Sequence, residues 1–169
     1  VRGFMGNYDQ LLANVHVEVS FSCELAASGA AGTAPKFSNL LLSCGTALTT
    51  VSSTSDTYAP ISASFPSSTL WFFVDGQRHK ITGARGSFAI NAEVSQIPTL
   101  DFTFQGIYNA PGASANPTPT TSLQATPVVF NKDNTTGFQL HSYAGALQSV
   151  SFDVANDLIY TERVGGTKG

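Results

Sequence analysis

Residues 13–25, ANVHVEVSFSCEL, alternate between apolar and polar side chains almost without interruption. One set is apolar: Val15, Val17, Val19, Phe21, Cys23 and Leu25. The other is mostly polar: Asn14, His16, Glu18, Ser20, Ser22 and Glu24. A period of two residues is that of a β-strand, and one apolar face opposite one polar face is typical of half-exposed antiparallel sheets. The chain is therefore expected to be built on an antiparallel sheet.

A short helix is expected directly after this strand, at about residues 34–44. Thr33 is a suitable cap, Pro35 suits the first turn, an apolar stripe follows, and Gly45 suits the end. Residues 46–69 are rich in Ser and Thr, and they predict irregular chain or an edge strand.

More strands are expected downstream. Asp75-Gly76 lies between two β-prone runs, which is a strong hairpin signal because this pair tolerates positive φ angles. Further strands are predicted in SFAINAEV and TLDFTFQGIY, joined by SQIP, and in GFQLHSY, LQSVSFDVA and LIYTERV. The fold class is therefore mainly β: an antiparallel β-sandwich or barrel of about eight strands, with one short helix and long loops.

The segment ITGARGSF, residues 81–88, places Arg85 between Gly83 and Gly86. A dinucleotide-binding loop needs a third glycine and a helix directly after it, whereas this segment continues as strand. A free adhesive tip is disfavoured by the apolar strand residues on both sides. The glycines instead predict a strand bend or bulge, with Arg85 paired to a carboxylate of its own or an adjoining subunit.

The 169 residues suit one domain, 1–169. Only 11% of them are charged, whereas Ser and Thr number 37, so the surface is expected to be hydroxyl-rich, as in an assembled or extracellular protein. Residues 109–127 predict an extended, exposed loop because they are rich in Pro, Ser and Thr.

Charge and hydropathy exclude several classes of partner. A net charge of −3 provides no basic surface for gripping nucleic acid, and the longest apolar patch, LWFFV, is too short to cross a bilayer. We therefore expect a soluble chain with no membrane partner. Cys23 and Cys44 lack zinc-site spacing and are expected to be buried thiols.

No catalytic, metal-binding or cofactor-binding site is predicted. His16, His79 and His141 are not near a nucleophile motif and share no close spacing. Carboxylate pairs such as Glu18 with Glu24 are what a polar strand face produces routinely. We therefore expect the protein not to be an enzyme.

Three blocks of the sequence resemble a known family. They are VHVEVSFSCELAASGAAGTAPKFSNLLLSCG, VDGQRHKITGARGSFAINAEVSQIPTLDFTFQGIY and NKDNTTGFQLHSYAGALQSVSFDVANDLIYTERVGG. In order and spacing they are similar to the tail tube proteins of long-tailed (siphovirus-like) bacteriophages, over most of residues 2–166.

This resemblance implies a structural virion protein without cofactors, made in the bacterial host cytoplasm. Its copies would close into rings, commonly hexameric, that stack into a tube around the tape-measure protein and later conduct DNA without binding it specifically. Tail terminator and baseplate or tail-tip proteins are the other implied partners. Family members carry extra strands at both ends, so the chain is expected to be trimmed.

Two sets of candidate residues follow. The polar strand residues His16, Glu18, Ser20, Ser22 and Glu24 are expected to face the lumen or the tube exterior, where a neutral or acidic surface lets DNA pass. The loop at 109–127 is expected to contact a neighbouring ring. The candidate assembly-interface residues are Asp75, Arg78, Arg85, Asn116, Pro117 and Pro119.

The main alternative is a carbohydrate-binding or fibre-type β-sandwich, suggested by the hydroxyl-rich surface and by Trp71, Phe72 and Phe73 beside a turn. Such a module needs an exposed aromatic platform, whereas alternation predicts that Trp71 or Phe72 is buried. A polysaccharide-degrading enzyme is a third hypothesis, but no convergent set of polar groups supports it.

Overall fold

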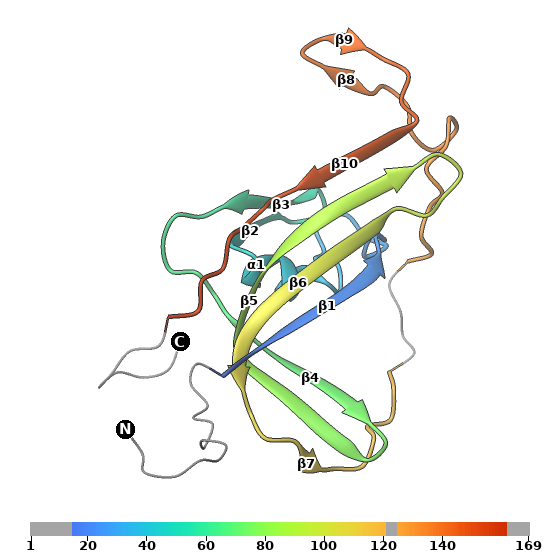
Figure 1. Ribbon diagram of the computed structural model, residues 1–169. Helices are drawn as coiled ribbons and strands as arrows, with labels where there is room; N and C mark the ends of the chain where they lie inside the picture. The colour runs from blue at the N-terminus through green and yellow to red at the C-terminus, as the bar shows by residue number, and fades with distance from the viewer. Residues whose placement is uncertain (1–14, 121–124, 162–169) are drawn as a thin grey trace, which may run out of the picture.

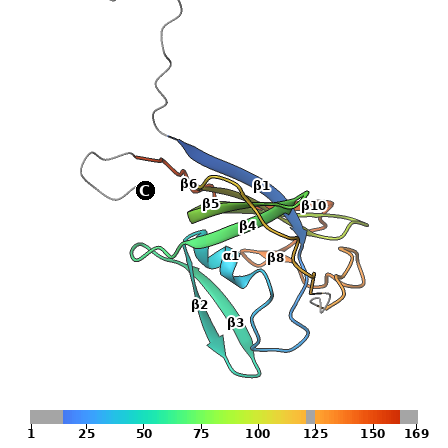
Figure 2. The same ribbon diagram turned by 90° about the horizontal axis from the view of Figure 1, so that it is seen from below.

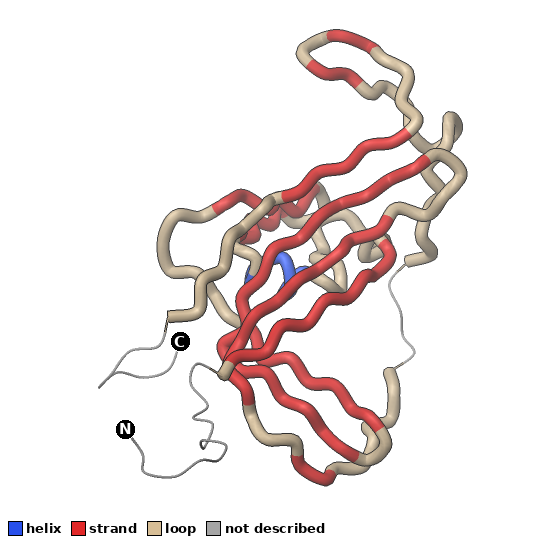
Figure 3. The backbone as a smooth tube through the Cα atoms, viewed as in Figure 1, coloured by secondary structure: helices blue, strands red, loops and turns tan. Residues whose placement is uncertain are grey.

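The protein is described here from a computed structural model, in which residues 15–120 and 125–161 are placed. Strands account for most of the regular structure (Figure 3). The elements are β1 (His16–Glu24), α1 (Ser38–Ser43), β2 (Thr46–Val51), β3 (Ser55–Pro60), β4 (Ser68–Val74), β5 (Gln77–Glu93), β6 (Thr99–Tyr108), β7 (Gly112–Ala113), β8 (Gln139–Leu140), β9 (Tyr143–Ala144) and β10 (Ser149–Asp153).

The main sheet has the strand order β1-β6-β5-β10, and β4 and β7 pair with the first part of β5 (Figure 1). All pairings are antiparallel. Phe21 lies opposite Phe102, which lies opposite Phe88, so the apolar residues of three strands share one face. The alternation in β1 thus gives the sheet the two-faced character that the sequence predicts.

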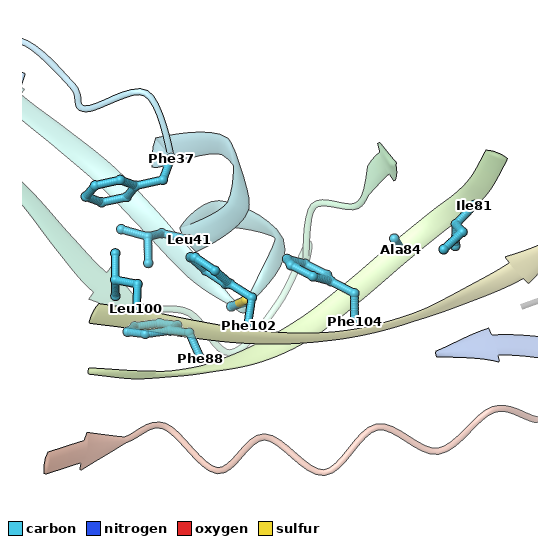
Figure 4. Close-up of a cluster of buried hydrophobic side chains, with 9 residues drawn as sticks. Phe37, Leu41, Ile81, Ala84, Phe88, Leu100, Phe102 and Phe104 are labelled. Carbon is cyan, nitrogen blue, oxygen red and sulfur yellow. The ribbon is translucent and has the colours of Figure 1, made fainter. Parts of the chain in front are cut away.

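The core lies between the apolar face of this sheet and a second layer formed by α1 and the β2–β3 hairpin (Figure 2). Phe37, at the N-terminal end of α1, and Leu41 point toward the sheet residues Leu100, Phe102 and Phe104 (Figure 4). The three sheet residues are at most 1% exposed. This two-layer packing is sandwich-like, and the described strands do not close into a barrel.

β5 is one continuous strand that bends at a β-bulge. The register against β6 shifts between Thr82 and Arg85, and Gly83 has a φ of 62°. A positive φ is readily adopted only by glycine, which explains why the bend occurs at this residue. Figure 1 shows β5 changing direction there, so that the β4–β5 hairpin diverges from the rest of the sheet. The bulge predicted for ITGARGSF is confirmed.

The helix is shorter than the predicted 34–44. The Ser38 N–H donates to the Pro35 carbonyl 3.0 Å away, which closes a turn before the helix begins, and no side chain caps α1. Thr33 therefore lies outside the helix that it was expected to cap. In the described ranges, no helix is long and apolar enough to cross a bilayer.

The other differences concern short strands. Residues 46–60 form a regular hairpin, β2–β3, where irregular chain or an edge strand was expected. GFQLHSY contributes β8 and the first residue of β9, whose two-residue strands pair with each other. LIYTERV forms no strand in its described part, residues 158–161, and its last three residues lie outside the described ranges.

Candidate functional site

The second face of the main sheet is polar across all four strands. The polar residues that point outward from these four strands form a surface that we call the polar face. They are His16, Glu18, Ser20, Ser22 and Glu24 of β1, Thr99, Asp101, Thr103 and Gln105 of β6, Arg85, Ser87, Asn91 and Glu93 of β5, and Ser149, Ser151 and Asp153 of β10. No described helix or strand covers this face (Figure 2). The five residues proposed from the β1 alternation thus lie together on one exposed surface.

A chain of side-chain hydrogen bonds crosses the polar face from one edge strand to the other. The Ser22 hydroxyl donates to Asp101, and the Asn91 amide donates to the other carboxylate oxygen of Asp101 at 2.6 Å. The Ser151 hydroxyl donates to the Asn91 carbonyl at 2.7 Å. These bonds link β1, β6, β5 and β10, so the serine hydroxyls on this face help to hold the four strands together.

The polar face is acidic. It carries five carboxylates and one cation, Arg85, in addition to His16. The carboxylates are Glu18, Glu24, Glu93, Asp101 and Asp153. The sequence identified only the two glutamates of β1, because grouping the others with them requires the strand register. The alternation in TLDFTFQ was the signal that Asp101 faces outward.

Arg85 is exposed just after the bulge, and its guanidinium donates to the Phe65 carbonyl oxygen at 3.2 Å. It lies at the rim of an apolar groove whose wall includes Tyr58, Phe65 and Phe152. Among the described residues it has no carboxylate partner. Pairing of Arg85 with an adjoining subunit stays a prediction.

Neither cysteine forms a disulfide; Cys44 is a buried thiol as predicted, whereas Cys23 is only partly buried. Burial raises the pKa of the Cys44 thiol to about 12. The pKa of Cys23 is raised by burial first, then by the charges of Asp101 and Glu24. Because the thiolate is the reactive form, both groups are held in an inert state near neutral pH.

Several of the predicted interface residues come together around the β4–β5 hairpin. Asp75 lies in its turn, Arg78 pairs with Gly112 of β7, and the Ser114 N–H donates to the Gly76 carbonyl at 2.9 Å. The exposed residues Asn116, Pro117 and Pro119 follow shortly after β7. The structure therefore brings the start of the 109–127 loop beside the hairpin, whereas Arg85 lies at the bulge.

The expectation that Trp71 or Phe72 is buried is wrong. Trp71 is 46% and Phe72 40% exposed, because the hairpin diverges from the part of the sheet that α1 and β2–β3 cover (Figure 1). The Trp71 ring is nevertheless covered by two cations, and the Phe72 ring stacks on His79 with centroids 4.5 Å apart. Neither ring is an open platform for a sugar.

The histidines lie apart and in ordinary settings. His16 stacks on Tyr160, His79 stacks on Phe72, and His141 occupies the β8–β9 turn. Within the described ranges, no group of three or more His, Cys, Asp or Glu side chains is arranged to hold a metal ion. The feature that distinguishes this surface is therefore its extended polar face.

Comparison with known proteins agrees with a role in assembly. A family model described as phage tail tube protein matches residues 1–169. No curated protein and no solved structure matches the chain. The family is that of a structural component of the virion tail, which assembles with other phage proteins. Since the match covers the whole sequence, the chain belongs to the phage tail tube protein family.

Proposed function

We propose that copies of this chain close into rings, hexameric as the resemblance implies, and that the rings stack into the tail tube of a long-tailed phage. The observation that carries this proposal is the main sheet itself, with two strand edges and one polar face that no described helix or strand covers. The role is structural and involves no catalysis.

The edges of the sheet are suited to ring closure. The order β1-β6-β5-β10 has four strands, each antiparallel to its neighbour, so β1 and β10 run in opposite directions. β10 of one copy can therefore pair with β1 of the next and continue an antiparallel sheet. Such head-to-tail contacts between identical copies generate closed rings, and they occupy edges that otherwise favour uncontrolled pairing.

We assign the polar face to the lumen. The apolar face is covered by α1 and β2–β3, so this second layer forms the outer part of the wall when sheets join edge to edge. A lumen lined by hydroxyls and carboxylates repels the phosphate backbone, which favours passage of DNA over retention. The tape-measure protein fills the same lumen before ejection, and terminator and tail-tip proteins cap the tube ends.

Electron microscopy of the purified protein, combined with light scattering, tests this proposal. We expect rings or hollow tubes whose abundance increases with protein concentration. Particles that stay monomeric at high concentration, also when tail-tip proteins are added to initiate assembly, would contradict it.

A further inference from the structure

The β4–β5 hairpin carries a cationic aromatic surface. Trp71 lies opposite Lys80 and Phe73 lies opposite Arg78, so these four side chains share one side of the hairpin, which we call the hairpin patch. The guanidinium carbon of Arg78 lies 4.6 Å and the Lys80 ammonium 5.1 Å from the Trp71 ring centroid. Asp75 in the turn offsets one of the two charges, which leaves the hairpin cationic.

The other end of the main sheet is acidic. The carboxylates of Glu24, Glu93, Asp101 and Asp153 lie on the polar face near the end of β5, and we call this group the acidic end. Lys132 in the nearby loop is followed directly by Asp133, so this loop adds no net charge. Figure 1 shows the hairpin and the end of β5 at opposite ends of the main sheet.

The hairpin patch lacks cover within the described part of the chain. Trp71 is 46% exposed, and Arg78 beside it is also exposed. Neither α1 nor the β2–β3 hairpin lies over this side, because they pack on the apolar face of the main sheet. An exposed aromatic ring flanked by two cations is suited to an acidic partner, since the cation–π contacts strengthen when water is removed.

We propose that the hairpin patch of one copy binds the acidic end of a second copy in the adjoining ring. The charges are complementary and lie at opposite ends of the same sheet, so each contact leaves one patch and one acidic end for the next copies. Such a contact repeats without closing and gives rings that stack in one direction. This inference rests on the proposed tube assembly, and it names the surfaces that join successive rings.

An electrostatic contact of this kind makes stacking sensitive to salt. Exposed charge pairs are screened at an ionic strength of about 0.15 M over roughly 8 Å, and complementary charges mainly accelerate association. Ring closure by backbone pairing between strand edges is much less sensitive. We therefore expect added NaCl to slow tube elongation while leaving rings intact.

The test compares the wild type with three variants by light scattering and negative-stain microscopy. Arg78→Glu with Lys80→Glu reverses the hairpin patch. Lys36→Glu with Thr49→Glu and Ser62→Glu makes the same change in net charge at exposed residues outside both the hairpin patch and the acidic end. The third variant adds Glu24→Lys, Glu93→Lys and Asp153→Lys to the reversed hairpin, so that three lysines face Asp101 at the acidic end and both surfaces change sign together.

We expect the reversed hairpin to form rings but at least tenfold fewer tubes, the control variant to elongate normally, and the doubly reversed variant to regain tubes. Normal tubes from the reversed hairpin would overturn this inference and leave the proposed function intact. A reversed-hairpin variant that folds but forms no rings would also overturn this inference, because the hairpin patch would then be required for ring closure. If the wild type forms neither rings nor tubes, the proposed function itself fails.

If the reversed hairpin does not fold, as judged by circular dichroism, Arg78→Gln with Lys80→Gln replaces it. This variant removes the charges and keeps side chains of similar length. Its tube yield is expected to be low and independent of NaCl, and a yield that falls with NaCl as in the wild type would contradict the inference.

Discussion

Gly86 lies at a close contact between β5 and β6. A Cβ atom there would lie 2.5 Å from the Thr103 carbonyl oxygen and 2.7 Å from a ring carbon of Phe104, which is fully buried. Backbone cannot yield as a flexible side chain does, so we expect Gly86→Ala to lower the free energy of unfolding by about 1–3 kcal/mol, the usual cost of overpacking.

Gly112 provides the matched control, because a Cβ atom there would have no neighbour within 4 Å. Gly112→Ala should change the free energy of unfolding by less than about 0.5 kcal/mol. Urea unfolding of both variants at low protein concentration measures the difference. Equal stabilities would show that β5 and β6 are not packed as closely as described.

Cys44 makes the stability depend on pH in the alkaline range. Its folded pKa is raised by burial to about 12 from an ordinary value of 9.0, so above pH 9 the unfolded chain ionises this thiol before the folded protein does. The group's contribution to stability is thus complete below pH 9 and is lost progressively as the pH rises toward 12.

Comparison of the wild type with Cys44→Ala isolates this effect from other groups that titrate in the same range. The difference in unfolding free energy between the two proteins should shrink between pH 8 and pH 10.5, as measured by urea unfolding. A constant difference would mean that the Cys44 thiol ionises equally well in the folded state.

At the scale of elements, the bulge in β5 decides where the β4–β5 hairpin points. Gly83 has a φ of 62°, and a Cβ atom there would meet only Ile107, at 3.9 Å. The cost of Gly83→Ala is therefore conformational rather than steric. We expect a loss of about 1–2 kcal/mol in unfolding free energy, the cost of this backbone region for a residue other than glycine.

If the bulge also aims the hairpin for assembly, Gly83→Ala should reduce tube yield more than ring yield. Thermal unfolding and microscopy of the same preparation test both statements. A variant as stable as the wild type would show that β5 does not need a left-handed residue at this position.

The elements that could be predicted from the sequence are those with a strong local pattern. Alternation identified β1 and β6, the Asp75-Gly76 pair identified the β4–β5 hairpin, and the glycines identified the bulge. The β2–β3 hairpin was missed because hydroxyl-bearing residues and prolines obscure its alternation. Its strands gain their order from packing with α1 over the main sheet, which is tertiary information.

The candidate site was predictable only in part for the same reason. The polar residues of β1 were found by alternation within one strand, whereas Glu93, Asp101 and Asp153 join them only through the register of four strands. The exposure of Trp71 and Phe72 depends on how far the second layer extends over the sheet. No local pattern encodes that extent.

At the scale of the whole molecule, the charge of the polar face should control the behaviour of DNA in the tube. Glu18→Lys with Ser20→Lys makes the centre of this face basic. The triple variant Thr49→Lys, Thr54→Lys and Ser62→Lys adds the same charge at exposed residues in and around the β2–β3 hairpin, in the second layer.

We expect only tubes with the basic polar face to retain short duplex DNA inside, with an affinity that falls steeply as salt increases. Nuclease protection of labelled DNA separates retention in the lumen from binding to the outer surface. Equal protection by both sets of tubes would contradict the assignment of the polar face to the lumen.

The most direct test of this account is a cryo-electron microscopy reconstruction of the assembled protein. It should show β10 of one copy paired antiparallel with β1 of the next, and Glu18, Ser20 and Ser22 lining the lumen. A tube with α1 and the β2–β3 hairpin facing the lumen, or with β1 and β10 not paired between copies, would contradict the account.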